Sequence, residues 1–65
     1  MRIDLNGRPA ETTATTLADA LIELGFADRP VATALNGDFI AAGFRRETTL
    51  RDGDRIEVLT PMQGG

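Results

Sequence analysis

Apolar and polar residues alternate near both ends of the chain. At the start, Asp4 stands between the apolar residues Ile3 and Leu5, and near the end Ile56 and Val58 are separated by Glu57. Alternation with a period of two is typical of a strand that buries one face. The two ends of the chain are therefore predicted to be strands of a sheet.

Tight turns divide the remaining strand segments. The dipeptides Asn6-Gly7 and Asn36-Gly37 accept the positive φ angles of a short hairpin loop, and Asp52-Gly53 is a further turn signal. Pro9 cannot donate a ladder hydrogen bond, so its strand is expected at an edge of the sheet. We predict four or five short strands, near residues 2–6, near 9–13, directly before Asn36, at Phe39-Ile40, and from Arg55 to just before Pro61.

The period changes to that of a helix over residues 16–24. Leu17, Ala20, Leu21 and Leu24 fall on one helical stripe. Thr15 or Thr16 is suited to the N-cap, and Asp19 in the first turn complements the helix dipole. Gly25 is placed for a left-handed C′ position, which would fold Phe26 back onto Leu21. Residues 41–49 have no clear period and are predicted to be a loop.

A single helix covers only one face of a sheet, so the pattern predicts an α+β fold: a mixed four- to five-stranded sheet with one main helix packed on one face. The other face would present Leu59 together with Ala32, Ala34 and Phe39, either as ordinary exposed apolar surface or as a partner-facing surface. The predicted core consists of Ile3, Leu5, Leu17, Leu21, Leu24, Val31, Leu35, Leu50, Ile56 and Val58.

Composition narrows the chemistry. The 65 residues contain no Cys and no His and carry a net charge of −3, with Arg45-Arg46 as the one basic pair. Cysteine- or histidine-based catalysis and zinc sites are thereby excluded, and neither nucleic acid nor a membrane is an expected partner. We expect a cytoplasmic protein that is not an enzyme and binds no cofactor or metal. The carboxylates are interpreted as solvated charges; they include Asp4, Asp19, Glu23, Asp28, Asp38, Asp52, Asp54 and Glu57.

The last residues offer a different kind of chemistry. Pro61 is expected to stiffen the exit from the last strand, and Gly64 and Gly65 lack a Cβ, so they fit a channel too narrow for other residues. We therefore expect a domain over residues 1–61 and a flexible C-terminal tail over 62–65 ending in Gly-Gly. The reactive group that such a tail delivers is the α-carboxylate of Gly65, which can attack the α-phosphate of ATP in a partner enzyme.

Two segments, the terminal glycine pair and the chain length together resemble a known family. The segments "VATALNGDFI" and "LRDGDRIEVLTPMQGG", with the terminal "GG" and the chain length, are similar to the ThiS family of sulfur carrier proteins of thiamine biosynthesis. The resemblance implies a β-grasp, ubiquitin-like fold in which the first and last strands pair in parallel near the centre of the sheet.

The resemblance also implies partners. An E1-like adenylyltransferase (ThiF-type) would use ATP and Mg²⁺ to adenylate Gly65, and a persulfide sulfur donor would convert the adenylate to a thiocarboxylate (1-thioglycine). Thiazole synthase (ThiG-type) would accept the sulfur for the thiazole ring. Met62, Gln63 and Gly64 would line the partner's active-site channel.

Three alternatives stay open at this stage. The chain also resembles TGS domains, which are β-grasp modules that bind RNA or small ligands, although those domains do not end in Gly-Gly. A ubiquitin-like modifier and a sulfur carrier for molybdenum cofactor or a similar pathway would share both the tail and the activation step. They differ from the thiamine carrier only in the acceptor.

Overall fold

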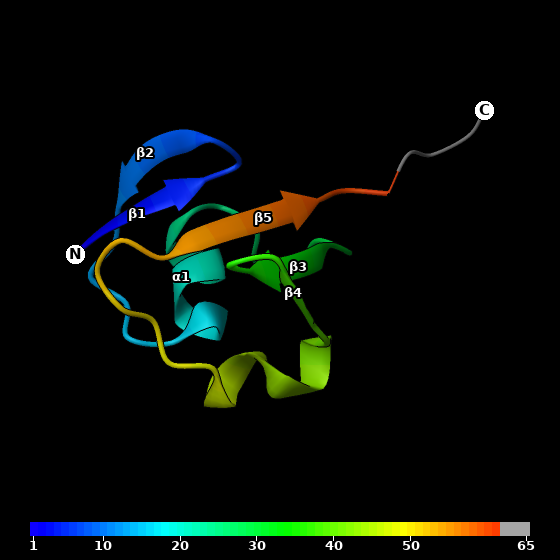
Figure 1. The fold of residues 1–65 in the computed structure, drawn as a ribbon. Helices are drawn as coiled ribbons and strands as arrows, with labels where there is room; N and C mark the ends of the chain where they lie inside the picture. The colour runs from blue at the N-terminus through cyan, green and yellow to red at the C-terminus, as the bar shows by residue number, and fades with distance from the viewer. Residues whose placement is uncertain (62–65) are drawn as a thin grey trace.

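Five strands form one mixed sheet in the computed structural model, which describes residues 1–61 (Figure 1). The strand order across the sheet is β2-β1-β5-β3-β4. The strands are β1 (Arg2–Leu5), β2 (Arg8–Glu11), β3 (Ala32–Leu35), β4 (Asp38–Ile40) and β5 (Arg55–Leu59). Together with one main helix, this is the α+β arrangement that the pattern predicted and the β-grasp fold that the family resemblance implied.

The first and last strands lie side by side and run in the same direction (Figure 1). Asp4 is paired with Arg55 and Leu5 with Ile56 in parallel register, while β3 flanks β5 on its other side in antiparallel register. The expectation of a central parallel pair is thus confirmed. Pro9 lies on β2 at the edge of the sheet, opposite Asp4, where its missing N–H leaves no ladder position unfilled.

Helix α1 (Leu17–Glu23) begins and ends as its sequence predicts. The Thr16 hydroxyl accepts a hydrogen bond from the N–H of Asp19, so Thr16 is the N-cap. At the other end Gly25 has a φ of 94°, and the N–H of Phe26 donates to the carbonyl of Leu21 at 2.8 Å. This is a Schellman motif, which satisfies the last carbonyls of a helix of only seven residues.

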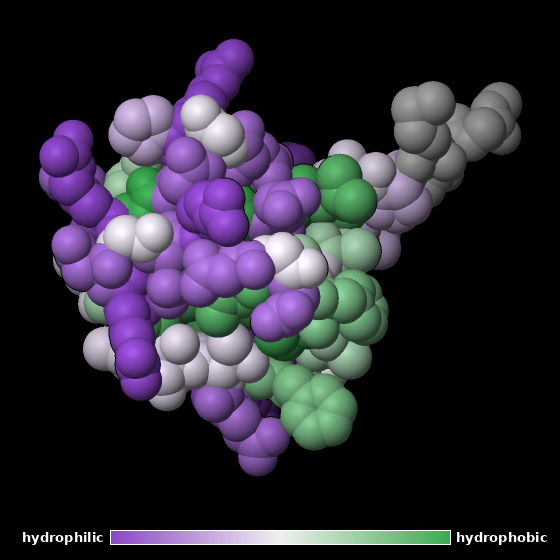
Figure 2. Space-filling model, viewed as in Figure 1, coloured by the Kyte–Doolittle hydropathy of each residue, from purple (hydrophilic) through white to green (hydrophobic). Residues whose placement is uncertain are grey.

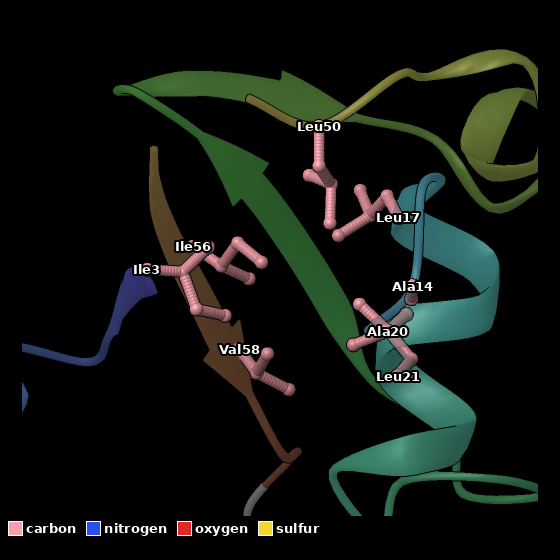
Figure 3. Packing of buried hydrophobic residues seen from close by; sticks show 8 residues of the cluster. All are labelled: Ile3, Ala14, Leu17, Ala20, Leu21, Leu50, Ile56 and Val58. Carbon is pink, nitrogen blue, oxygen red and sulfur yellow. The ribbon is translucent and has the colours of Figure 1, made fainter. Parts of the chain in front are cut away.

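The core lies between α1 and one face of the sheet. In Figure 3, Ile3, Ile56 and Val58 lie on the sheet side of the cluster and Leu17 and Leu21 on the helix side. Six of the ten predicted core residues are buried. The other four are only half-buried and pack against the edge of the cluster: Leu5, Leu24, Val31 and Leu35. Ala14 and Ala20 are buried in addition, because small side chains allow α1 and its leading segment to lie close to the sheet.

The prediction of a plain loop over residues 41–49 is wrong. Residues Ala42–Glu47 form a 3₁₀ helix, η1, in which the N–H of Phe44 donates to the carbonyl of Ala41 at 2.9 Å. A 3₁₀ segment of six residues has no room to show an amphipathic period, so the sequence pattern did not indicate it. None of the helices within residues 1–61 has the length and apolar character that a membrane-spanning helix requires.

Candidate functional site

The exit of β5 is the point where the folded domain leads toward the predicted tail. Ile56 and Val58 anchor β5 in the core, and the alternating residues Arg55, Glu57 and Leu59 point to the exposed face. Pro61 is the last residue that the structure describes, and it is exposed. The predicted tail residues Met62, Gln63, Gly64 and Gly65 lie outside the described residues.

Asn6 fixes β5 close to this exit. Its N–H donates to the carbonyl of Ile56 at 2.9 Å. Its side-chain Oδ1 accepts the N–H of Val58 at 2.8 Å, and its Nδ2 donates to the carbonyl of the same Val58 at 3.1 Å. The carboxamide therefore holds both backbone groups of Val58, one residue before the end of the strand.

The four residues predicted to form a partner-facing surface lie on one face of the sheet. Ala32 is paired with Leu59 across β3 and β5, and Ala34 is paired with Phe39 across β3 and β4. Paired residues of neighbouring strands share a face, and this is the face opposite α1. Leu59 and Phe39 are large apolar side chains that are 67% and 72% exposed. We call these four residues the outer apolar face.

An open apolar groove extends the outer apolar face to the exit of β5. Figure 2 shows hydrophobic residues gathered on the side of the molecule from which the last strand leaves. The groove is lined by Pro30, Val31, Ala32, Leu59, Thr60 and Pro61. Pro30, Val31 and Thr60 were missed as site residues, although the antiparallel register that places Ala32 opposite Leu59 also brings their segments together. The register between β3 and β5 depends on how two distant strands pair, so the local sequence does not indicate it.

Charge borders the outer apolar face toward the start of β5. Glu57 lies opposite Ala34, and Arg55 lies beside Asp4 on the neighbouring strand. The face thus changes along β5 from charged to apolar in the direction of the strand exit. Such a surface suits recognition by another protein, since apolar area supplies affinity and the charged border supplies orientation.

The described residues contain no candidate metal site. Among residues 1–61, no three His, Cys, Asp or Glu side chains are grouped so that they could hold a metal ion. What the fold provides is an exposed apolar face beside the end of a central strand. This arrangement defines a β-grasp domain of the ubiquitin-like fold class.

Comparisons with known proteins place the chain within that class. The model of the ThiS family matches residues 3–65. The sulfur carrier protein ThiS of Thermus thermophilus is 39% identical over 61 residues, which cover 94% of this chain and 95% of that protein. The crystal structure of the thiamine biosynthesis protein ThiS from Geobacter metallireducens is 30% identical, with a TM-score of 0.84 and full coverage of both chains. A solution structure of a thiamine biosynthesis protein from the same organism is also 30% identical, with a TM-score of 0.80. The match covers all of this chain and 88% of that chain.

The chain therefore belongs to the ThiS family. It is a sulfur carrier of thiamine biosynthesis and not an enzyme. Membership favours this function over the TGS-like module, the modifier and the molybdenum-cofactor carrier. A thiazole synthase of Magnetococcus marinus is also 39% identical over 66 residues, but this chain spans only 20% of its length.

Proposed function

We propose that sulfur is carried on the C-terminal carbonyl carbon of Gly65 as a thiocarboxylate. The observation on which this depends is the family match, which runs through the glycine pair to residue 65. Met62, Gln63 and Gly64 would occupy the partner's channel. The lack of a Cβ at residues 64 and 65 suits a narrow passage.

Activation begins with an E1-like adenylyltransferase (ThiF-type) that uses ATP and Mg²⁺. A carboxylate oxygen of Gly65 attacks the α-phosphate of ATP and pyrophosphate leaves, which gives an acyl-adenylate. The terminal sulfur of a persulfide donor then attacks the acyl carbon and AMP leaves. A second thiol breaks the S–S bond by forming a disulfide with the donor sulfur, and this step releases the thiocarboxylate.

The outer apolar face is the proposed docking surface for the activating partner. Leu59 is two residues before Pro61, so a partner that covers Leu59, Phe39, Ala32 and Ala34 also holds the point from which residues 62–65 continue. Burying exposed apolar side chains supplies the affinity, at about 25 cal/mol per Å² removed from water. The tail is then delivered without contributing much binding energy itself.

Thiazole synthase (ThiG-type) is the proposed acceptor of the sulfur. In the Magnetococcus marinus thiazole synthase, a segment similar to the whole of this chain lies within one polypeptide. Two proteins that act on each other are often found joined in this way, and the arrangement supports the assignment of the partner. The thiocarboxylate sulfur would be the nucleophile that enters the thiazole ring.

Intact-mass measurement tests the proposal. The protein is incubated with ATP, Mg²⁺, an adenylyltransferase of the ThiF type and a persulfide donor. We expect a mass gain equal to the replacement of one oxygen by sulfur, located on Gly65 by fragmentation and lost when ATP is omitted. Deletion of Gly65 should abolish the gain while thermal unfolding is nearly unchanged. An unchanged mass with competent partners would contradict the proposal, and isopeptide adducts on other proteins would favour a modifier.

A substitution on the outer apolar face tests the docking surface separately. Leu59→Asp should raise the KM of the adenylyltransferase for this protein by at least about tenfold, as loss of a central apolar contact does. The matched control is Phe44→Asp on η1, because Phe44 is 63% exposed and Leu59 is 67% exposed. The control should leave KM within about twofold. Equal effects of the two substitutions would rule out the outer apolar face as the docking surface.

A further inference from the structure

A second groove lies on the side of the sheet that carries α1. It runs between α1, the turn that follows it, and η1, which lies beside α1 (Figure 1). Leu21, Ile22 and Phe26 contribute apolar surface to it. Ile22 is 62% exposed, although it is a large aliphatic residue on the main helix. The groove therefore has apolar surface that nothing within residues 1–61 covers.

Three arginines line the same groove, against a single acidic residue. They are Arg29, Arg45 and Arg46, and the acidic residue is Asp28. The whole chain has a net charge of −3, so this groove is locally opposite in sign to the molecule. Arg45 and Arg46 are the basic pair of the sequence, and the sulfur-carrier function assigns them no role.

Arg45 is held in a fixed orientation by neutral acceptors. Its Nε donates to the hydroxyl of Thr33 at 3.0 Å, and its Nη2 donates to the carbonyl of Val31 at 2.7 Å. The Thr33 hydroxyl in turn donates to the carbonyl of Ile40 at 2.9 Å. These bonds orient the guanidinium without neutralising its charge. A guanidinium that is already ordered loses less entropy when it binds a carboxylate.

We infer that this groove binds an acidic segment of a partner protein, with an apolar side chain against Ile22 and Phe26 and a carboxylate on Arg45. The apolar surface argues for a peptide segment over a simple anion, and the arginines argue for acidic residues in it. The site is on the opposite side of the sheet from the outer apolar face. A partner can therefore hold the carrier here while the end of β5 is engaged elsewhere, and the inference does not depend on the proposed sulfur chemistry.

Amide NMR of the intact protein tests the inference with a defined probe. The probe is a blocked pentapeptide of two leucines and three glutamates, compared with the same peptide carrying glutamines. We expect shifts confined to residues around the groove, an affinity about tenfold higher for the glutamate peptide, and weakening by added salt. Equal affinity for both peptides, or shifts spread over all arginines of the chain, would overturn the inference. So would sodium phosphate that gives the same shifts at the same concentration, because the site would then be a simple anion site.

Arginine substitutions show which positive charge of the groove binds the glutamate peptide. Arg45→Gln should weaken binding of the glutamate peptide about tenfold, and Arg46→Gln about threefold. Arg46→Gln keeps the test valid if Arg45→Gln fails to fold, because Arg46 is an exposed residue. The matched control is Arg8→Gln on the edge strand β2, which should leave the affinity unchanged. Equal losses in Arg46→Gln and Arg8→Gln would contradict a specific groove.

Discussion

The two Asn-Gly turns look identical in sequence and form hairpins of the same geometry. Asn6 and Asn36 have φ angles of 52° and 50°, and the glycines that follow have φ angles of 84° and 88°. Each asparagine also bonds to β5, a strand that its own hairpin does not contain. They do so at opposite ends of β5, since Asn36 reaches Arg55 and Asn6 reaches Val58.

In both turns the side-chain oxygen takes the place of the residue's own backbone carbonyl. Asn36 and Arg55 would exchange two backbone hydrogen bonds in a regular antiparallel ladder, but the Arg55 N–H instead donates to Oδ1 of Asn36 at 2.9 Å. Asn6 does the same in a parallel ladder with the N–H of Val58. A turn residue can thus fix the register of a third strand, because its carboxamide continues the ladder after the backbone has turned away.

The turns differ in what the amide nitrogen binds. Nδ2 of Asn6 donates to the carbonyl of Val58, so both side-chain bonds of Asn6 hold β5 itself, and both are partly buried. Nδ2 of Asn36 donates to the carboxylate of Asp54 at 3.0 Å, in an exposed position. The end of β5 nearest the predicted tail is therefore held more firmly than its beginning.

The largest effect is expected from Asn6→Ala. The substitution removes two hydrogen bonds, worth about 1 kcal/mol each. It also places an alanine at a positive φ, which costs about 1 kcal/mol more. The free energy of unfolding should fall by about 3 kcal/mol in urea titrations. A loss below about 1 kcal/mol would show that the carboxamide does not hold Val58.

Glycine substitutions compare the two turns without the φ penalty. Asn6→Gly should cost about 2 kcal/mol and Asn36→Gly about 1 kcal/mol. The difference is expected because both side-chain bonds of Asn36 are exposed to water, whereas both of Asn6 are partly buried. The added freedom of glycine in the unfolded chain is the same for both, so each variant is the control for the other. A larger loss for Asn36→Gly would reverse the comparison.

The sequence predicted the elements better than the contacts between them. Both hairpin turns, the Thr16 cap and the left-handed Gly25 are local features, and all are confirmed. The link from Asn6 to Val58 joins residues 52 positions apart, so no local pattern shows it. Likewise, η1 is held by Arg45 contacts to the β3 region, and these depend on tertiary structure.

The candidate site was likewise predicted where it depends on local pattern and missed where it depends on strand pairing. Alternation along β5 places Leu59 on the exposed face, and the structure brings Ala32, Ala34 and Phe39 to the same face. The groove residues Pro30 and Thr60 depend on strand register, which alternation alone does not provide. Pro30 and Thr60 lie next to the paired strands β3 and β5. Predicting that they share a groove would have required the register between these two strands.

The smallest effect concerns Glu23, whose bonds to Thr13 are made by a titratable carboxylate. It contrasts with Asn6, whose side-chain bonds involve no titratable group. Its carboxylate accepts hydrogen bonds from the Thr13 hydroxyl at 2.6 Å and from the Thr13 N–H at 2.9 Å. Chiefly the hydroxyl bond, and then the N–H bond, lower the pKa of Glu23 below its ordinary value of 4.5. A carboxyl group with a lowered folded-state pKa stabilises the fold above that ordinary value, and the stabilisation is lost as the pH falls through the folded-state pKa.

Thermal unfolding as a function of pH isolates this contribution. Wild type should be slightly more stable than Glu23→Gln at neutral pH, and the difference should shrink below pH 4.5, because the amide does not titrate. The other carboxylates are common to both proteins and cancel in the difference. Asn6→Gly should lie below wild type by the same amount at every pH, since the link between Asn6 and Val58 contains no titratable group. Parallel curves for wild type and Glu23→Gln would show that the link between Thr13 and Glu23 adds nothing to stability.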